Sequence, residues 1–271
     1  MSQAESHSAQ IDLPPRGGRV LSPKERLIVA LDVSTLAEAK VLIEALASHV
    51  GMFKAGLELF TACGNEIFEI VEASGAKLFF DGKFHDIPNT VAGACRAVVN
   101  KGPVVSLFNL HAQGGGPMME AAVAARDQAF AALLANGKVK AEEKPALIAV
   151  TILTSMKAET LKSDLKVELP MVEMVASLAA LTRKSGLDGV VASAKEAAII
   201  RKVCGPDFLI VTPGIRPSWA SADDQARIVT PAAAIAGGAD MIVVGRPITA
   251  AGSTKLSQDA ARRIVDELAG A

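Results

Sequence analysis

The chain has 271 residues, of which 50% are hydrophobic and 21% are charged. That length fits one large domain, and that composition is typical of a soluble protein with a sizeable core. Basic and acidic side chains number 28 and 29, so the formal net charge is −1, and bulk electrostatics predict neither nucleic-acid nor membrane binding.

The first 22 residues differ in character from the rest. They are polar, contain proline and glycine, and lack the apolar run of a secretory signal, so we expect a flexible N-terminal extension (1–22) followed by one domain (23–271). The three cysteines, Cys63, Cys95 and Cys204, are isolated and lack metal-ligand spacing. Such core thiols are typical of a reducing compartment, which predicts a cytoplasmic protein.

Short apolar runs recur along the remainder of the chain and predict β-strands. In chain order they are Leu27–Val33, Met52–Leu57, Lys77–Lys83, Val104–His111, Leu147–Leu153, Gly189–Ser193, Phe208–Pro213 and Met241–Pro247. Amphipathic segments predict helices at Thr35–Ser48, Glu66–Ser74, Val91–Lys101, Met118–Ala135, Met171–Ser185, Lys195–Val203 and Lys255–Leu268. This alternation over one domain's length predicts an α/β fold closed into a (β/α)8 TIM barrel.

The structural alternative is an open, doubly wound parallel sheet, because near-continuous apolar strands suit any parallel sheet that is covered on both faces. Such sheets often carry a Gly-rich dinucleotide fingerprint after the first strand. Here that position reads LDVST over Leu31–Thr35, without glycine. The closed barrel is therefore favoured.

Charged residues interrupt the apolar strands near their carboxyl ends. They are Asp32, Lys54, Asp81 and Lys83 on the first three strands and Arg246, which follows Gly245, at the end of the eighth. Singly, such residues have structural explanations, since an Asp can cap the next helix and a Lys can extend to solvent. Two acids and two bases at neighbouring strand ends would carry a large desolvation cost without a function. In barrels the active site lies at these ends, so the sequence predicts a charged site there.

Other features predict local structure rather than chemistry. Pro88 suits the first turn of a helix and Asp86 suits its N-cap. The glycines at 114–116 predict a tight turn into a helix in preference to a phosphate cradle. The histidines lack ligand spacing, so no metal is expected, and of them only His111 is expected to line the site.

The segment Asp81–Thr90 reads DGKFHDIPNT, and it resembles the DxKxxDIPNT element of the orotidine 5′-phosphate decarboxylase family. Further similar segments follow in the family's order, at Ala30–Asp32, Phe53–Lys54, Asn109–Ala112, Val150–Ser155, Thr212–Pro217 and Val244–Ile248. The ordered set is far more specific than any one piece. Gly82 departs from the pattern, in which a larger residue is usual. The resemblance implies a barrel that converts orotidine 5′-phosphate to uridine 5′-phosphate and CO2 in de novo pyrimidine biosynthesis, without cofactor or metal.

The resemblance implies catalytic roles for Lys83, Asp81, Asp86 and Lys54. Lys83 would protonate C6 of the pyrimidine, and Asp81 would face the substrate carboxylate. Lys54, with Asp32, would hold the ribose and orient the charged network. The residue chemistry agrees, because an ammonium flanked by carboxylates stays protonated and can stabilise and then protonate a carbanion.

The resemblance also implies a set of substrate-binding residues. They are Asp32, Lys54, Asp81, Ile87, Thr90, Thr154, Arg216, Gln225, Gly245 and Arg246. Thr154 would contact the pyrimidine edge. The phosphate would be held by Arg216, Gln225 and Arg246 together with the backbone N–H of Gly245. The polar stretch 217–229, which carries Gln225, suits a lid.

The resemblance implies a homodimer in which Asp86 and Thr90 complete the partner subunit's site, with orotidine 5′-phosphate as the only other partner and no nucleic acid or membrane. Two alternatives stay open. The first is a sugar-phosphate decarboxylase or aldolase on the same barrel, which uses Mg2+ and an acid where Lys54 stands here, so a cation replaces a metal ligand. The second is a non-catalytic phosphometabolite-binding protein, since a fold alone implies no activity.

Overall fold

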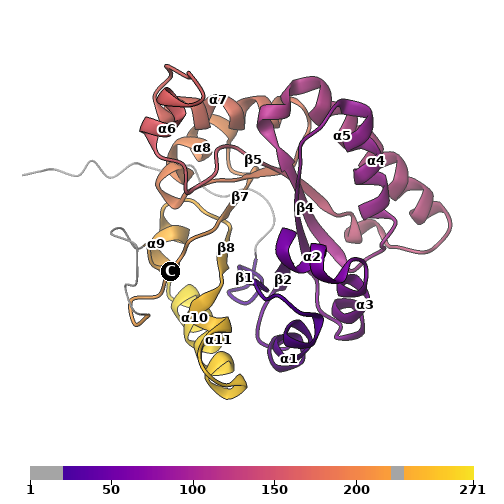
Figure 1. Cartoon of the computed structure of the whole chain (residues 1–271), viewed down its shortest axis with the longest axis vertical. Coiled ribbons are helices and arrows are strands. Elements are labelled where there is room, and N and C mark those ends of the chain that lie inside the picture. Colours follow the sequence, from indigo (N-terminus) through magenta and orange to yellow (C-terminus); the bar gives the residue numbers. More distant parts are fainter. Residues whose placement is uncertain (1–20, 221–228) are drawn as a thin grey trace, which may run out of the picture.

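The computed structural model describes residues 21–220 and 229–271. Eight parallel strands pair in sequence order and close into a barrel, which confirms the predicted (β/α)8 fold (Figure 1). The strands are β1 (Leu27–Ala30), β2 (Met52–Ala55), β3 (Leu78–Phe84), β4 (Val105–His111), β5 (Ala146–Val150), β6 (Gly189–Val191), β7 (Leu209–Thr212) and β8 (Met241–Val244). The predicted extension falls almost wholly on residues 1–20, outside the described residues.

Helices surround the barrel (Figure 1). They are α1 (Leu36–Leu46), α2 (Leu57–Cys63), α3 (Glu66–Ala73), α4 (Pro88–Val99), α5 (Gly115–Ala135), α6 (Ala158–Ser163), α7 (Met171–Lys184), α8 (Ala197–Cys204), α9 (Pro231–Ala236), α10 (Arg246–Thr249) and α11 (Thr254–Ala269). The helices predicted from amphipathic patterns are all present. Four short ones, α2, α6, α9 and α10, were not predicted.

Five predicted strands extend two or three residues past the observed carboxyl ends, those of β1, β2, β5, β6 and β8, and two of the five run into a helix. The expected strand Met52–Leu57 stops at Ala55, and α2 begins at Leu57. The expected strand Met241–Pro247 stops at Val244, and α10 begins at Arg246. In both cases a glycine stands between strand and helix as the N-cap, so a tight turn replaces the last residues of the apolar run.

The apolar side chains form two layers separated by the sheet. Ile28 and Ala30 point into the barrel, where they pack with residues such as Phe79 and Leu107. Side chains of alternate pleat positions pack outward against the helices. Because both faces of each strand are buried, the strands read as continuous apolar runs in the sequence.

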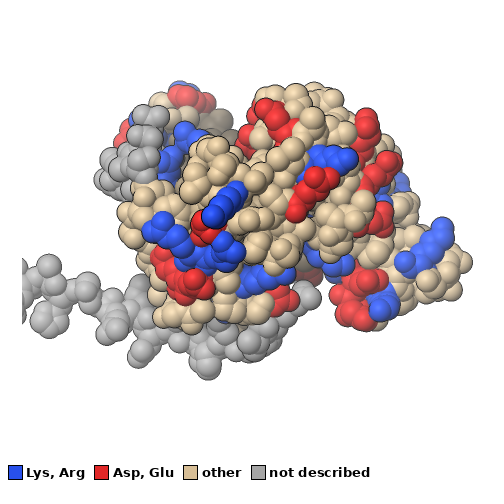
Figure 2. Space-filling view, turned by 90° about the horizontal axis from the view of Figure 1, so that it is seen from below, with Lys and Arg blue, Asp and Glu red and all other residues tan. Residues whose placement is uncertain are grey.

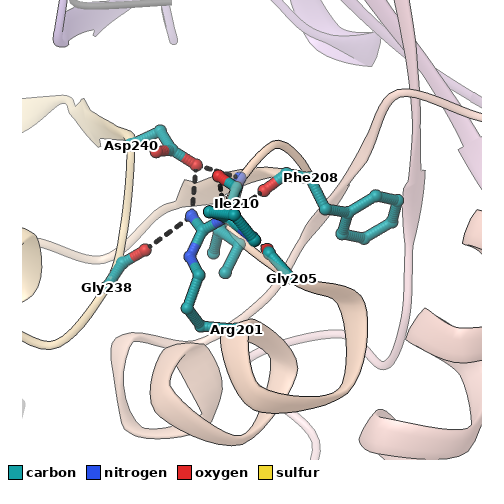
Figure 3. A network of polar contacts seen from close by, with 7 residues as sticks. Arg201, Gly205, Phe208, Ile210, Gly238 and Asp240 are labelled. Carbon is teal, nitrogen blue, oxygen red and sulfur yellow. Dashed lines mark hydrogen bonds and ion pairs between the residues drawn. The ribbon is translucent and has the colours of Figure 1, made fainter. Parts of the chain in front are cut away.

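A buried arginine ties the amino-terminal ends of β7 and β8 together (Figure 3). The Arg201 side chain is 1% exposed, and its guanidinium donates to Asp240 Oδ2 at 2.6 Å and to four backbone carbonyls, those of Gly205, Pro206, Phe208 and Gly238. Asp240 also accepts the backbone N–H of Ile210 at 2.8 Å. The charge is thus satisfied by many acceptors, as a buried arginine requires.

The same arrangement recurs two strands earlier. Asp188, just before β6, accepts from the buried guanidinium of Arg126 and from the N–H of Leu147 in β5. Asp188 therefore links the start of β6 to the start of β5, and Asp240 links the start of β8 to the start of β7. These bonds fix the register of each strand pair. This device holds the end of the barrel opposite the charged strand ends.

On the face shown in Figure 2, basic and acidic side chains lie in small mixed groups, in keeping with a net charge near zero. Among the described residues, no helix is long and apolar enough to cross a lipid bilayer.

Candidate active site

The four charged residues of the first three strands form one continuous row of alternating sign. Lys54 Nζ lies 3.0 Å from Asp32 Oδ1 and 3.3 Å from Asp81 Oδ2. Lys83 Nζ lies 2.7 Å from Asp81 Oδ1. The row follows from the topology, because β1, β2 and β3 are neighbours and Lys54 is in register with Ala30 of β1 and Phe79 of β3. The predicted cluster is therefore confirmed as a geometric unit.

Asp81 is the centre of this row and is only 7% exposed. Burial by itself would raise the pKa of its carboxyl group. The charges of Lys54 and Lys83 and the hydrogen bonds from Lys83 and Asn109 outweigh burial, so the pKa of Asp81 lies below its ordinary value. Asp81 is thus ionised at neutral pH, between two ammonium groups.

Lys83 reaches Asp81 through an irregular strand rather than through simple alternation. The pairing of β3 with β4 shifts register between Phe80 and Phe84. Within this bulge Lys83 has φ = 49°, a left-handed conformation that is uncommon for a residue with a side chain. Asp81 and Lys83, two residues apart, therefore meet across a bulge and not on one face of a regular strand.

Gly82 fits the same bulge. A Cβ atom at this position would lie 2.7 Å from Cε1 of Phe80 and 3.2 Å from Cε1 of Phe84. The rings of these two phenylalanines are tilted against each other, with centroids 6.0 Å apart. Glycine at 82 therefore makes room for the paired rings, and a larger residue would have to displace Phe80.

Asn109 of β4 is the residue of this site that the sequence argument did not single out. It is fully buried, and its Nδ2 donates to Asp81 Oδ1 at 2.7 Å. Its Oδ1 accepts the backbone N–H of Lys83 at 2.8 Å. A buried amide in an apolar strand is costly unless it is bonded, and that was the available signal.

His111 ends β4 beside this row. Burial, followed by the neighbouring His85 and Lys83, lowers its pKa below the ordinary value for histidine. The rings of His111 and His85 lie 5.5 Å apart. In the part of the chain that the structure describes, no three His, Cys, Asp or Glu side chains are grouped as metal ligands.

The segment after β3 departs from one prediction. The N-cap of α4 is Ile87, and the prediction that Asp86 is the N-cap is wrong. The residue before a proline avoids helical angles, so the helix begins at Pro88 and Ile87 takes the cap position. Asp86 accepts the N–H of Ile87 at 2.6 Å instead. Asp86, Ile87 and Thr90 are all exposed, and Ile87 is 65% exposed.

The expected phosphate-binding residues lie after β7 and β8. Arg216 and Arg246 line a cavity of about 440 Å³, together with Trp219 and Arg263. The Arg263 guanidinium lies 4.2 Å from the centroid of the Trp219 ring, so Trp219 packs against α11. Gln225 and most of the expected lid lie outside the described residues.

The remaining expected residues stand at the same end of the barrel. A Cβ atom at Gly245 would lie 3.6 Å from Asp32 Oδ2, so the backbone after β8 adjoins the charged row. Thr154 is exposed in the segment after β5. The glycines at 114–116 complete a 3₁₀ turn, Ala112–Gly114, and begin α5, in line with the predicted turn into a helix.

Comparison with known proteins adds to this geometry. Residues 25–263 match the model of the "Orotidine 5′-phosphate decarboxylase / HUMPS family". The chain belongs to this family. Two curated family members named orotidine 5′-phosphate decarboxylase, from Geotalea daltonii and Pelobacter propionicus, are 47% and 49% identical to it over 245 residues. These alignments cover 90% of the chain and 96% and 95% of the relatives.

Solved structures of similar sequence share the barrel of the orotidine 5′-phosphate decarboxylase family. The structure of orotidine 5′-phosphate decarboxylase from Lactobacillus acidophilus is 35% identical, with a TM-score of 0.73, and the match covers 89% of this chain and 98% of that one. An uncharacterised conserved protein from Geobacillus kaustophilus is 37% identical, also with a TM-score of 0.73, over 89% and 99% of the two chains.

Proposed function

We propose that this protein decarboxylates orotidine 5′-phosphate to uridine 5′-phosphate and CO2 in pyrimidine biosynthesis. The observation that carries the proposal is the alternating row of Asp32, Lys54, Asp81 and Lys83, with an ionised, buried Asp81 between two lysines. The family match and the names of the relatives agree with it.

Decarboxylation requires stabilisation of the negative charge that develops on C6 of the pyrimidine. When the bond between C6 and the carboxylate breaks, its electron pair stays on C6 and CO2 leaves, and no adjacent π-system can accept that pair. An ammonium at Lys83 stabilises the developing charge and then donates its proton to C6. The resulting amine recovers a proton from water, so no cofactor enters the balance.

Asp81 and Lys54 act on the charges around this step. Asp81 holds Lys83 Nζ in place at 2.7 Å and faces the substrate carboxylate, which raises the energy of the bound substrate relative to the transition state. Lys54, bonded to both Asp32 and Asp81, orients the row, and with Asp32 it binds the ribose.

The rest of the substrate is held from the other strand ends. Thr154 contacts the pyrimidine edge. Arg216, Gln225 and Arg246, with the N–H of Gly245, bind the phosphate, because guanidinium groups match phosphate oxygens in a bidentate manner. Phosphate binding at loops after strands seven and eight is common in barrels of this kind. Binding energy from the phosphate then orients the ring for reaction.

We also propose that the catalytic unit is a homodimer. Asp86, Ile87 and Thr90 are exposed at the rim, and no hydrogen bond or ion pair in the described residues joins them to the row of their own chain. In an isologous interface these residues reach the partner subunit's site. The proposed organisation is one barrel domain (23–271) after an extension (1–22). The proposed compartment is the cytoplasm, in which the three free cysteines would remain reduced.

The alternative on the same fold, a Mg2+-dependent sugar-phosphate decarboxylase or aldolase, is disfavoured by Lys54. This ammonium occupies the position where that reaction needs an acidic ligand, and it is already bonded to both neighbouring carboxylates.

The experiment is direct. Purified protein is mixed with orotidine 5′-phosphate, and the change in pyrimidine absorbance is followed with release of CO2 and formation of uridine 5′-phosphate. Catalytic turnover is expected. Binding of the substrate without turnover would instead indicate a phosphometabolite-binding protein, and would overturn the proposal.

A further inference from the structure

Three hydrogen bonds join Asn109, Asp81 and Lys83 into a closed ring. Lys83 N–H donates to Asn109 Oδ1 at 2.8 Å, Asn109 Nδ2 donates to Asp81 Oδ1 at 2.7 Å, and Lys83 Nζ donates to the same Oδ1 at 2.7 Å. The ring spans two strands, since Asn109 lies in β4 and the other two lie in β3. One amide thus contacts both the backbone of the lysine and the carboxylate that holds its ammonium.

The backbone at Lys83 needs such a contact. Its φ of 49° is disfavoured for a residue with a Cβ atom, and it interrupts the pairing of β3 with β4. Strained conformations of this kind persist only where surrounding groups hold them. The bond from Lys83 N–H to Asn109 replaces the ladder bond that the bulge removes.

The chemistry of the ring also selects the residue type at 109. The position must accept one hydrogen bond, from an N–H, and donate another, to a carboxylate. A carboxamide does both with a single planar group. A carboxylate would accept the first bond but repel Asp81, and a methyl group would leave the part-buried N–H of Lys83 without this partner.

We propose that Asn109 is a positioning residue for the decarboxylation. It touches none of the reacting atoms; it holds the Lys83 backbone in the left-handed conformation and fixes Asp81 Oδ1, and so places the Lys83 ammonium. This inference rests on the proposed function for its effect on catalysis, while its structural part concerns this chain alone.

The first test is kinetic and uses Asn109→Ala and Asn109→Asp with orotidine 5′-phosphate. In both variants kcat falls by about 10–100-fold at pH 8, because a hydrogen bond to a charged or strained group is lost. KM changes by less than about threefold, since the phosphate-binding residues are untouched. Thr182→Val is the matched control: Thr182 is a fully buried polar residue in α7, and its hydroxyl donates to the carbonyl of Leu178 and contacts Met119 Sδ.

The pH profile separates positioning from mere stability. In Asn109→Asp the new carboxyl would share a proton with Asp81 at low pH and donate again, so its kcat relative to wild type rises as the pH falls from 8 to 5. Other titratable groups near this position, Asp32, Lys54, Lys83, His85 and His111, are present in wild type and in both variants, so Asn109→Ala serves as the reference for their contribution. The ratio for Asn109→Ala stays flat. Unchanged kcat in both variants, or the same flat ratio for both, would overturn the inference.

The second test needs no substrate. Lys83→Gly and Lys83→Ala are compared by chemical unfolding, first with Asn109 present and then in the Asn109→Ala background. Because glycine adopts positive φ without strain, Lys83→Gly is the more stable of the two while Asn109 enforces the bulge. That advantage falls by more than half once Asn109 is replaced. An equal advantage in both backgrounds would reject the positioning role, whether or not the protein decarboxylates the nucleotide.

Discussion

Replacing Asp81 by asparagine removes the negative charge between two lysines while keeping the shape of the side chain. Asp81 is 7% exposed, and the Lys54 and Lys83 side chains are 12% and 28% exposed. Breaking a buried ion pair costs about 3–5 kcal/mol. In the variant, Lys54 keeps its ion pair with Asp32, and the Lys83 ammonium can be hydrated by water. We therefore expect Asp81→Asn to lower the free energy of unfolding by roughly 2–3 kcal/mol at pH 7.

The loss is pH-dependent, and its sign follows from the pKa of Asp81. The folded-state pKa lies below the ordinary value, so the charge stabilises the folded protein above the unfolded-state pKa of about 3.9. That contribution disappears as the pH falls through the folded-state pKa. The gap in unfolding free energy between wild type and Asp81→Asn should therefore be full at pH 6–8 and should narrow below about pH 4.

The assay is thermal and urea unfolding of both proteins at pH 7 and at the lowest pH at which the wild type stays folded. At pH 7 the expected loss corresponds to roughly 5–10 °C in Tm for a chain of this size. Thr182→Val serves as a control. Neither side chain titrates, so the difference in unfolding free energy between this variant and wild type should not depend on pH. An Asp81→Asn variant as stable as wild type at pH 7 would refute this role of Asp81. A difference in unfolding free energy that does not change with pH would refute it as well.

Three further predictions concern activity. Chelation by EDTA is expected to leave turnover unchanged; a loss that Mg2+ restores would favour the sugar-phosphate alternative. Arg246→Ala should lower kcat/KM by weakening phosphate binding, and an unchanged kcat/KM would place the phosphate elsewhere. Mixing inactive Lys83→Ala and Asp86→Ala homodimers should give heterodimers with one intact site, hence about half of wild-type activity per heterodimer and about a quarter for the randomly reassorted mixture. No recovery, with subunit exchange confirmed by mass, would reject a shared site.

The strands and the charged row could be predicted because both follow from one-dimensional patterns. Continuous apolar runs mark strands buried on both faces, and charges at their carboxyl ends must meet at one mouth of a barrel. The ends of β2 and β8 could not be predicted from the same pattern. Leu57 and Pro247 continue the apolar runs, but they already lie in short helices that begin after glycines.

The errors inside the site have a different origin. In the bulge, the N–H of Lys83 donates to Asn109, which is 26 residues away in the chain, so no local propensity indicates this conformation. The cap of α4 is shifted to Ile87 by the conformational restriction that Pro88 imposes. The first feature involves a group far along the chain, whereas the second follows from Pro88 itself, whose effect on the preceding residue the N-cap prediction did not take into account.

The central claim is that Lys83 supplies the proton that completes decarboxylation at C6. The most direct measurement is the turnover of orotidine 5′-phosphate by Lys83→Ala beside wild type, with folding checked by Tm and active-site integrity checked by binding of uridine 5′-phosphate. The account predicts a rate lower by about 10²–10⁴-fold with the product still bound. A folded variant that keeps more than about a tenth of the wild-type rate would contradict it.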